Sequence, residues 1–496
     1  MGVETQTRGA DPVPVTLDGR SLSLDELIRV ARSQDRVELS RDAVQRMSVS
    51  RVVCERALAR GDRVYGLTTG VGARKDTCVN RVLAGAFNRS LILNSRVGTG
   101  PPAAVEVVRA TMVCLLNLLL SGLPGVRAEL ALVICRALNE RRHPILRTRG
   151  SVGQADLAPL ADLANGLFVS GGSELAPGEG LALIDNNAFA TALTAVAIHD
   201  CKRLLDALDV VGALELEAFV ANLDIVHVLA EQRPFPGLLD TLGRLRALLA
   251  GSSLTEPGAA RNLQDPLCYR CLPQVHGAAR DALQFALGQL AIELNAAQNN
   301  PLVSLEEDRL VSLASFEILP LATAVDSMRV ALAPVLTCAV ERMIKLLHPA
   351  FSGLRGGLAA GPDAADDGFN EFAVAGQAVA AEARLLAQPV SYELVSTSGA
   401  EGIEDRTTMA PLGARRLSEM VALAHELAAM ELAVATRALL LRAPTRLGSG
   451  AARVQRMVTD LLGPQELGAP VPADLEPLQN LVGSDALAAV ADECAA

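Results

Sequence analysis

The stretch that decides how this chain folds is Gly150-Ser151-Val152-Gly153-Gln154-Ala155-Asp156-Leu157-Ala158-Pro159-Leu160. Around it, Leu, Val and Ala recur at three- and four-residue spacing, which is the period of an α-helix with one apolar face. The clearest segments of this kind are 105–121, 188–232, 277–297, 324–347, 373–387 and 415–441. Alternating patterns typical of strands are scarce, so the sequence predicts an all-α fold.

The segment 192–231 runs for about forty residues without a proline or a tight turn signal. That is longer than an ordinary globular helix and suits a long helix bundle. Segments rich in Gly and Pro at 171–180, 234–257 and 353–368 indicate loops between helical blocks. We expect three parts: a flexible N-terminal arm over 1–20, an N-terminal domain over 21–190, and a central long-helix bundle with a C-terminal helical part over 191–496.

The composition argues against two classes of partner. The chain has 496 residues and a formal net charge of −11, and it lacks the basic balance that binding to nucleic acid requires. Residues 1–14 carry charges and prolines where a signal peptide needs an apolar stretch. The best candidate for a membrane span, 110–126, contains Asn117, two glycines and Pro124. We therefore expect neither nucleic acid nor a membrane as partner.

The cysteines indicate a reducing compartment. The chain has nine of them, an odd number without a regular framework, which fits a cytoplasmic protein. Cys268 and Cys271 have the spacing of a zinc half-site, but no second pair of cysteines or nearby pair of histidines completes it. We expect no metal site.

The stretch 150–160 resembles the Gly-Ser-Val-Gly-Ala-Ser-Gly-Asp-Leu-Ala-Pro-Leu motif of the histidine and phenylalanine ammonia-lyases. In that family the Ala-Ser-Gly tripeptide cyclises and dehydrates to 4-methylideneimidazol-5-one (MIO), the electrophile that captures the substrate. Here Gln154-Ala155 stands in its place, so one residue, the hydroxyl that leaves as water and the glycine that closes the ring are missing. The resemblance therefore implies a superfamily member without MIO, and we expect no other cofactor.

Further motifs extend the resemblance over residues 63–416. They are Val64–Gly72, which resembles the loop of the catalytic tyrosine, then 263–274, 293–302, Ser315-Phe316-Glu317 and Glu404-Asp405. The resemblance implies an ammonia-lyase-like bundle of long central helices, and a homotetramer with composite active sites.

Four residues take catalytic or binding roles from this resemblance. Tyr65 is the expected base, although a phenol with a pKa near ~10 needs surroundings that favour the phenolate. Arg270 offers a planar fork that suits a substrate carboxylate, and Gln264 is a second polar contact. Loop packing for Tyr65, a salt bridge for Arg270 and a helix cap for Gln264 are the alternatives. Glu404 is a base, a cation anchor or a packing acid.

Several candidate binding positions depart from the family pattern. Leu267 replaces a second active-site tyrosine, and Ser95 occupies a position that often holds a substrate-selecting His or Leu. Asp185 replaces an asparagine, and Glu317, after the pocket residue Phe316, replaces a histidine.

Two positions have thus become acidic beside Glu404. Carboxylates gathered in a pocket raise each other's pKa unless a cation joins them. Either the pocket binds a cationic substrate group, or Asp185 and Glu317 pair with arginines such as Arg96 or Arg406. The residues alone leave both readings open.

Without MIO, ordinary deamination should fail, because ammonia is a poor leaving group. We favour a MIO-independent carbon–nitrogen lyase that acts on an amino-acid-derived carboxylate and expels a better leaving group such as a trialkylamine, as ergothionase-like relatives without MIO do. The alternatives are another acid/base reaction (cyclisation, dehydration or isomerisation) and a non-catalytic homologue. An aromatic cage would support the first reading, although aromatic content is only 3%. A filled pocket would support the last.

Overall fold

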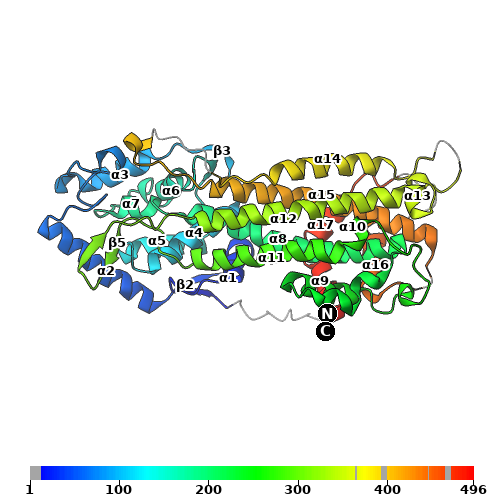
Figure 1. Ribbon diagram of the computed structural model, residues 1–496. Helices are drawn as coiled ribbons and strands as arrows, with labels where there is room; N and C mark the ends of the chain where they lie inside the picture. The colour runs from blue at the N-terminus through cyan, green and yellow to red at the C-terminus, as the bar shows by residue number, and fades with distance from the viewer. Residues whose placement is uncertain (1–12, 363–365, 393–398, 445, 464–470, 496) are drawn as a thin grey trace, which may run out of the picture. The chain divides into compact units, whose positions relative to one another are not determined.

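The computed structural model describes residues 13–362, 366–392, 399–444, 446–463 and 471–495. The chain divides into two compact units, each built from three segments. The first unit comprises the described residues of Met1–Val196, Gly288–Thr323 and Val390–Ala414, and the second those of Ala197–Leu287, Ala324–Pro389 and Arg415–Ala496. Both units are mostly helical (Figure 1), which confirms the predicted class of fold.

The first unit combines short helices with small sheets. Its strands are β1 (Val15–Leu17), β2 (Val37–Leu39), β3 (Thr99–Pro102), β4 (Arg147–Arg149), β5 (Leu302–Ser304) and β6 (Arg309–Val311). Its helices are α1 (Leu24–Ile28), α2 (Arg41–Arg60), α3 (Ala84–Asn94), α4 (Val105–Leu120), α5 (Ala128–Asn139), α6 (Leu157–Ala164) and α7 (Glu179–Ile184). Strand β1 pairs in parallel with β2, whereas β3–β4 and β5–β6 are antiparallel pairs.

Local sequence explains where these elements begin and end. Ser23 and Glu26 form a capping box that starts α1, and Gly61, at φ 77°, ends α2 in the left-handed conformation. Helix α4 buries almost every side chain, as expected of a helix that is apolar on all sides. Strand β4 ends at Arg149, opposite Thr99 of β3, so this ladder fixes the point at which the stretch 150–160 begins.

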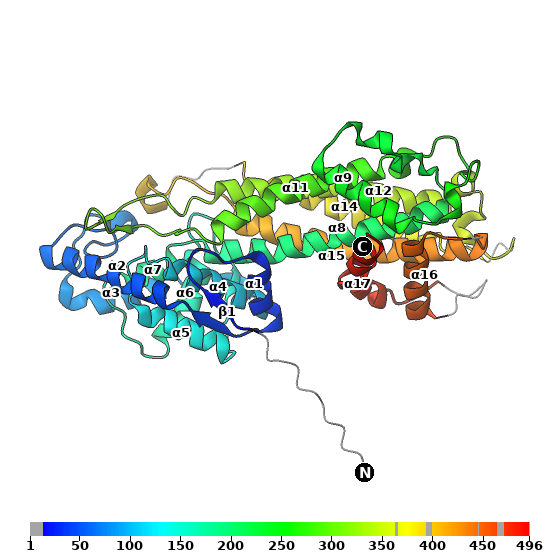
Figure 2. The ribbon, with the colours of Figure 1, turned by 90° about the horizontal axis from the view of Figure 1, so that it is seen from below.

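The second unit is built around long helices. Its shorter ones are α9 (Pro236–Leu248), α10 (Leu267–Arg270), α13 (Pro349–Ser352), α14 (Glu371–Leu386), α16 (Ser449–Leu462), α17 (Glu476–Val482) and α18 (Ala486–Ala495). Helices α9, α16 and α18 pack against one another (Figure 2). Four long helices contribute residues to both units: α8 (Ala188–Phe219), α11 (Leu272–Glu293), α12 (Leu319–Leu347) and α15 (Ala410–Arg442).

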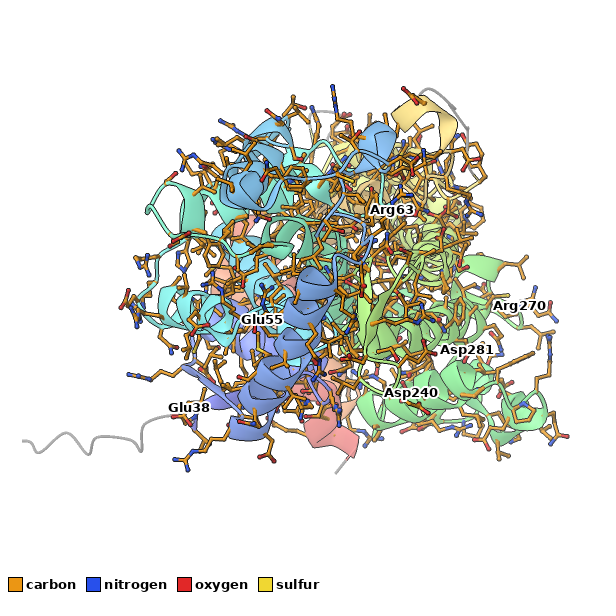
Figure 3. The ribbon with its side chains drawn as sticks, turned by 90° about the vertical axis from the view of Figure 1, so that its left-hand side faces the viewer. Glu38, Glu55, Arg63, Asp240, Arg270 and Asp281 are labelled. Atoms are coloured by element: carbon orange, nitrogen blue, oxygen red, sulfur yellow. The ribbon has the colours of Figure 1, made fainter. Side chains whose placement is uncertain are left out.

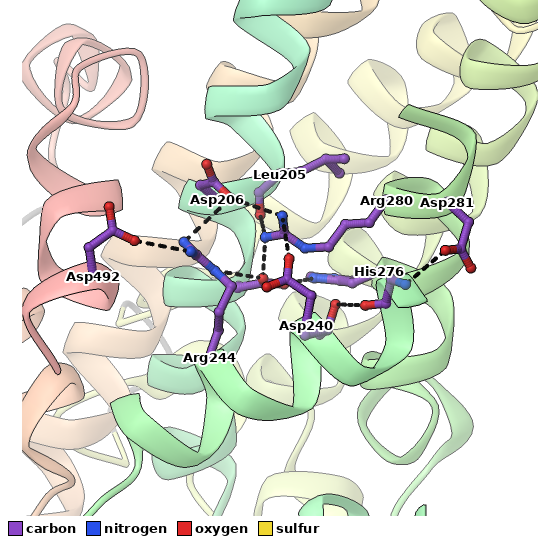
Figure 4. Close-up of polar contacts among 11 residues, drawn as sticks. Leu205, Asp206, Asp240, Arg244, His276, Arg280, Asp281 and Asp492 are labelled. Carbon is purple, nitrogen blue, oxygen red and sulfur yellow. Dashed lines mark hydrogen bonds and ion pairs between the residues drawn. The ribbon is translucent and has the colours of Figure 1, made fainter. Parts of the chain in front are cut away.

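A buried polar network joins α8, α9 and α11 within the second unit (Figure 4). Asp209 of α8 is fully buried; its Oδ1 lies 2.8 Å from His276 Nδ1, and its Oδ2 accepts a hydrogen bond from Arg280. Burial alone would raise the pKa of Asp209, but Arg280, His276 and Arg244 outweigh it and lower the pKa. Arg244 also lies 3.3 Å from Asp492 of α18. The network is therefore charge-compensated and ties the C-terminal helix to the unit.

Three features differ from the sequence-based expectations. Within the expected arm 1–20, residues 1–12 lie outside the described residues, and Val15–Leu17 is a strand with buried Val15 and Leu17. The first unit is discontinuous in sequence: its N-terminal segment ends at Val196, near the expected boundary at residue 190, and the chain returns to the unit at 288 and 390. Helix α8 ends at Phe219 because Val220 adopts a φ of 59°, and Asn222 then caps a new turn.

One helical stretch in the described part of the chain, Glu179–Phe219, has the length and apolarity to cross a membrane. Its most apolar window is completely buried inside the protein, as in the core helix of a globular domain. It is not the segment 110–126 that the sequence had suggested as the best candidate.

Candidate active site

A cavity of about 580 Å³ lies within the first unit. Six of the residues predicted from the sequence line it: Tyr65, Ser95, Gln154, Asp185, Phe316 and Glu404. They come from the loop before α3, the end of α3, the stretch 150–160, the end of α7, the segment before α12 and the segment before α15. The fold therefore gathers most of the predicted site around one open space.

The loop that carries Tyr65 is held by its glycines and threonines. Gly66 has a φ of 67°, and a Cβ atom there would lie 2.1 Å from Leu181 Cδ2, so only glycine lets the loop pack on α7. Thr68 Oγ1 donates to Asp62 O at 2.6 Å and accepts from Val64 N–H at 2.8 Å. These contacts fix the half-buried Tyr65 at the cavity wall.

Tyr65 is a protonated phenol in this environment. Its hydroxyl oxygen accepts a hydrogen bond from Gly72 N–H at 2.9 Å, a contact that favours the phenolate. Burial raises the pKa of Tyr65 above its ordinary value, and the negative charges of Asp185 and Glu404 raise it further, which outweighs the Gly72 contact. Tyr65 can act as a base only if something positive offsets these effects.

Asp185 is the most unusual group of the cavity. Asp185 is 8% exposed, and within the described chain no hydrogen bond or ion pair reaches its carboxyl oxygens. Burial first, and then the charge of Glu404, raise its pKa from 3.8 to about 7. Asn299 fixes this position by donating to the backbone carbonyls of Ala182 and Asp185 at 2.9 and 3.0 Å.

Glu317 has a different environment, although both acids replace uncharged or weakly basic family residues. Its Oε1 accepts from Leu319 N–H at the start of α12, and its Oε2 accepts from Gln154 Nε2 at 2.8 Å. Arg406 lies 3.6 Å from Oε2. Of the two alternatives for the acidic residues, Glu317 therefore fits pairing with an arginine and not binding of a substrate cation. The other named arginine, Arg96, lies 3.3 Å from Asp162, so neither arginine pairs with Asp185.

The stretch 150–160 is anchored on both sides of Gln154-Ala155. Asp156 Oδ1 accepts from Ser151 Oγ at 2.6 Å, and Oδ2 accepts from Ala190 N–H at 2.7 Å in the first turn of α8. Burial raises the pKa of Asp156 to about 6. Thr408 Oγ1 donates to Gly153 O at 2.8 Å. A Cβ atom at Gly153 would lie 2.2 Å from Thr408 Oγ1, so the contact requires glycine. The motif residues shared with the family thus have structural partners.

The residues between these anchors do not fit the MIO group. Cyclisation needs a glycine amide nitrogen and a serine hydroxyl, and the chain has Gln154-Ala155 there. The Gln154 side chain is bonded to Glu317, and the two residues also form an isolated antiparallel bridge. Ala155 is buried with a φ of 59° and does not line the cavity.

Gln264 and Arg270 lie in the second unit, on another cavity of about 670 Å³. Arg270 donates to Gln264 Oε1 at 3.0 Å, and Figure 3 labels Arg270 together with Asp240 and Asp281 of the same unit. The described residues show neither a salt bridge from Arg270 nor a helix cap by Gln264. Both side chains remain available for a carboxylate.

Tyr269 and Leu267, which lie close to Arg270 in sequence, have opposite environments. Tyr269 is fully buried, its ring centroid lies 3.9 Å from that of Phe219, and its hydroxyl donates to Arg342 O at 2.9 Å. Leu267 is 62% exposed. Tyr269 therefore belongs to the core and does not replace the absent active-site tyrosine.

Sequence reasoning missed several residues of the cavity. Asn300, Thr407 and Met409 line it, and Asn299 orients Asp185 as described above. The Asn299-Asn300 pair was visible as part of a family-like turn, which was the available signal. No group of three or more His, Cys, Asp or Glu residues in the described segments could hold a metal ion.

Comparisons with known proteins agree with this architecture. The sequence matches the aromatic amino acid lyase family over residues 22–174 and 172–460. It is 33% identical over 463 residues to the histidine ammonia-lyase of Alkaliphilus metalliredigens, covering 88% of this chain and 90% of that protein. It is 31% identical over 500 residues to the histidine ammonia-lyase of Myxococcus xanthus, covering 96% and 98%. The chain belongs to the aromatic amino acid lyase family, a family of enzymes.

Solved structures extend the comparison. The ergothioneine-degrading ergothionase of Treponema denticola, in complex with desmethyl-ergothioneine sulfonic acid, matches with a TM-score of 0.89 and 27% identity, covering 96% of this chain and 99% of that one. The histidine ammonia-lyase of Trypanosoma cruzi matches with a TM-score of 0.87 and 26% identity, covering 97% and 95%. The ammonia-lyase fold is thus shared along almost the whole chain.

Proposed function

We propose that this protein is a MIO-independent carbon–nitrogen lyase that acts on an amino-acid-derived carboxylate with a quaternary or otherwise cationic amine as leaving group. The observation that carries the proposal is the unpaired, buried carboxyl of Asp185, which lines an open cavity together with Tyr65 and Glu404. An acidic pocket of this kind suits a permanent positive charge. The ergothionase among the structural relatives supports the same class of reaction.

In the proposed reaction Tyr65, as phenolate, takes a proton from the carbon next to the one that bears the amine. The electrons of the broken C–H bond form a C=C bond, and those of the C–N bond leave with the amine. A trialkylammonium group departs as a neutral amine, so the step needs no electrophile. Glu404 and Asp185 bind the cation before it leaves.

Arg270 and Gln264 are the proposed anchor for the substrate carboxylate. The guanidinium presents a fork that matches two carboxylate oxygens, and the described residues give it no acidic partner. From the resemblance to the ammonia-lyases we further propose a cytoplasmic homotetramer in which active sites combine residues of several subunits.

The second candidate is another acid/base reaction on a related acid, namely cyclisation, dehydration or isomerisation. It is favoured by the limited aromatic lining, since among the described residues around the cavity only Tyr65 and Phe316 are aromatic. A non-catalytic role is less consistent with an open cavity of about 580 Å³.

The experiment is a product analysis by mass spectrometry. The purified protein is incubated with trimethylammonium betaines of amino acids and with the parent amino acids. The proposal predicts trimethylamine and an unsaturated acid from at least one betaine, and no ammonia from the parent compounds. Conversion of an acid without loss of an amine would favour the second candidate and overturn the first.

A further inference from the structure

The cavity contains a base that its own surroundings disable. Burial and two carboxylates keep Tyr65 protonated, and Arg406, the lining residue of opposite charge, lies next to Glu317. A second small cavity is also lined by Tyr65, together with Arg51 and Cys54. Arg51 donates to Pro177 O at 3.0 Å and lies 3.5 Å from Glu55. The nearby arginines are therefore engaged with other groups.

We propose that Asp185, Glu404 and Tyr65 form a site for an ammonium group, and that the bound cation itself converts Tyr65 into the phenolate that performs catalysis. The inference rests on the proposed function, because it takes the cationic substrate from it. It adds that the positive charge is a requirement of the chemical step as well as of binding.

The geometry supports this coupling at three points. Asp185 lies nine-tenths buried on the cavity wall, and its carboxyl has no partner within the described chain. Tyr65 and Glu404 line the same cavity as Asp185. Gly72 N–H already donates to that hydroxyl oxygen at 2.9 Å, so a phenolate formed there has a hydrogen-bond donor in place.

A cation among these groups reverses the sign of the local field. It neutralises the carboxylates that oppose ionisation of Tyr65, and it attracts the phenolate directly. An opposite charge within ~4–6 Å lowers a pKa by about 1–3 units. Thermodynamic linkage makes the effect reciprocal, so the affinity for the cation must rise as Tyr65 ionises. The proton that leaves Tyr65 is released to solvent.

The consequence is selectivity at the step that breaks the C–H bond. An uncharged molecule of the same shape can enter the cavity but leaves Tyr65 as a phenol, which cannot accept a proton. Discrimination between a cationic substrate and a neutral isostere is then expected in kcat as well as in KM.

The test uses tetramethylammonium chloride as the probe and tyrosine ring-carbon NMR as the readout. The chain has only three tyrosines, so labelling at the carbon that bears the hydroxyl gives few signals, and Tyr65→Phe assigns the relevant one. Tyr269 is fully buried and Tyr392 is 68% exposed, and both serve as internal references. Sodium chloride at equal concentration and tert-butanol, a neutral isostere, are the controls.

The proposal predicts that tetramethylammonium lowers the titration midpoint of Tyr65 by about 1–3 units, with no matching change from either control. Asp185→Asn should weaken binding of the probe about tenfold or more, whereas Asp42→Asn, at an exposed site in the first turn of α2, should not. Glu404→Gln, at an exposed residue, should also weaken binding of the probe, and it replaces Asp185→Asn in the test if that variant does not fold.

A Tyr65 midpoint that tetramethylammonium moves no more than sodium chloride does would overturn the inference. If betaines are turned over in that case, the proposed function still holds. If the midpoint shifts but no betaine is turned over, the cation site holds and the proposed function fails.

Discussion

Replacement of Asp185 by asparagine should stabilise the folded protein at alkaline pH. The variant keeps the shape of the side chain and removes a charge that the cavity disfavours. Burial first, and then Glu404, raise the pKa of Asp185 from 3.8 to about 7. A shift of one unit corresponds to about 1.4 kcal/mol, so ionised Asp185 costs the fold up to about 4 kcal/mol.

The direction with pH follows from proton linkage. Between pH 3.8 and about 7 the folded state keeps a proton on Asp185 that the unfolded chain has lost, so wild-type stability falls as the pH rises through this window. The stability that comes from keeping Asp185 protonated in the folded state is fully present below about pH 4 and is lost above about pH 7. Asp185→Asn lacks this dependence, so its advantage should grow from near zero at pH 4 to at most about 4 kcal/mol at pH 8.

The assay is urea unfolding at a series of pH values. The chain has no tryptophan, so circular dichroism of the helices is the suitable signal. Asp42→Asn, at an exposed aspartate, is the matched control and should show a small difference that does not follow this window. A variant that is no more stable than wild type at pH 8, or an advantage independent of pH, would refute the description of Asp185 as a desolvated, unpaired acid.

Three further outcomes are expected. Tyr65→Phe keeps the ring and removes the hydroxyl, so turnover should fall about 10²–10⁴-fold with substrate binding nearly unchanged, and wild-type turnover would exclude Tyr65 as the base. Arg270→Lys keeps the charge but loses the planar fork, so it should chiefly raise KM; a loss confined to kcat would contradict the anchoring role. Light scattering should show a tetramer, since the proposed active site combines residues of several subunits, and a stable monomer at micromolar concentration would argue against that site.

The sequence predicted the class of fold, and it named six residues that line one cavity, because both depend on ordered motifs. Tyr65, Ser95, Gln154, Asp185, Phe316 and Glu404 lie in separate segments of the chain, yet all line one cavity. Helical periodicity placed α11, α12 and α15 within about five residues of their observed bounds. Val220 shows the limit of periodicity: its φ of 59° ends α8 at a residue type that gives no such signal.

The partners of the acidic residues could not be read from the sequence. Asp185 and Glu317 offered the same alternatives, pairing or cation binding. The difference between them arises from a non-local bridge between Gln154 and Glu317 and from the start of α12 beside Glu317. Contacts of this kind depend on tertiary packing, as does the return of the chain to the first unit at residue 288.

The direct test of the central claim, chemistry without MIO, is the mass of the purified protein together with peptide mapping of the stretch 150–160. We expect the plain sequence mass, 51.9 kDa, with an unmodified Gly153-Gln154-Ala155-Asp156 segment. A deficit of two water molecules localised to that segment would show that an electrophile forms from it and would contradict the account.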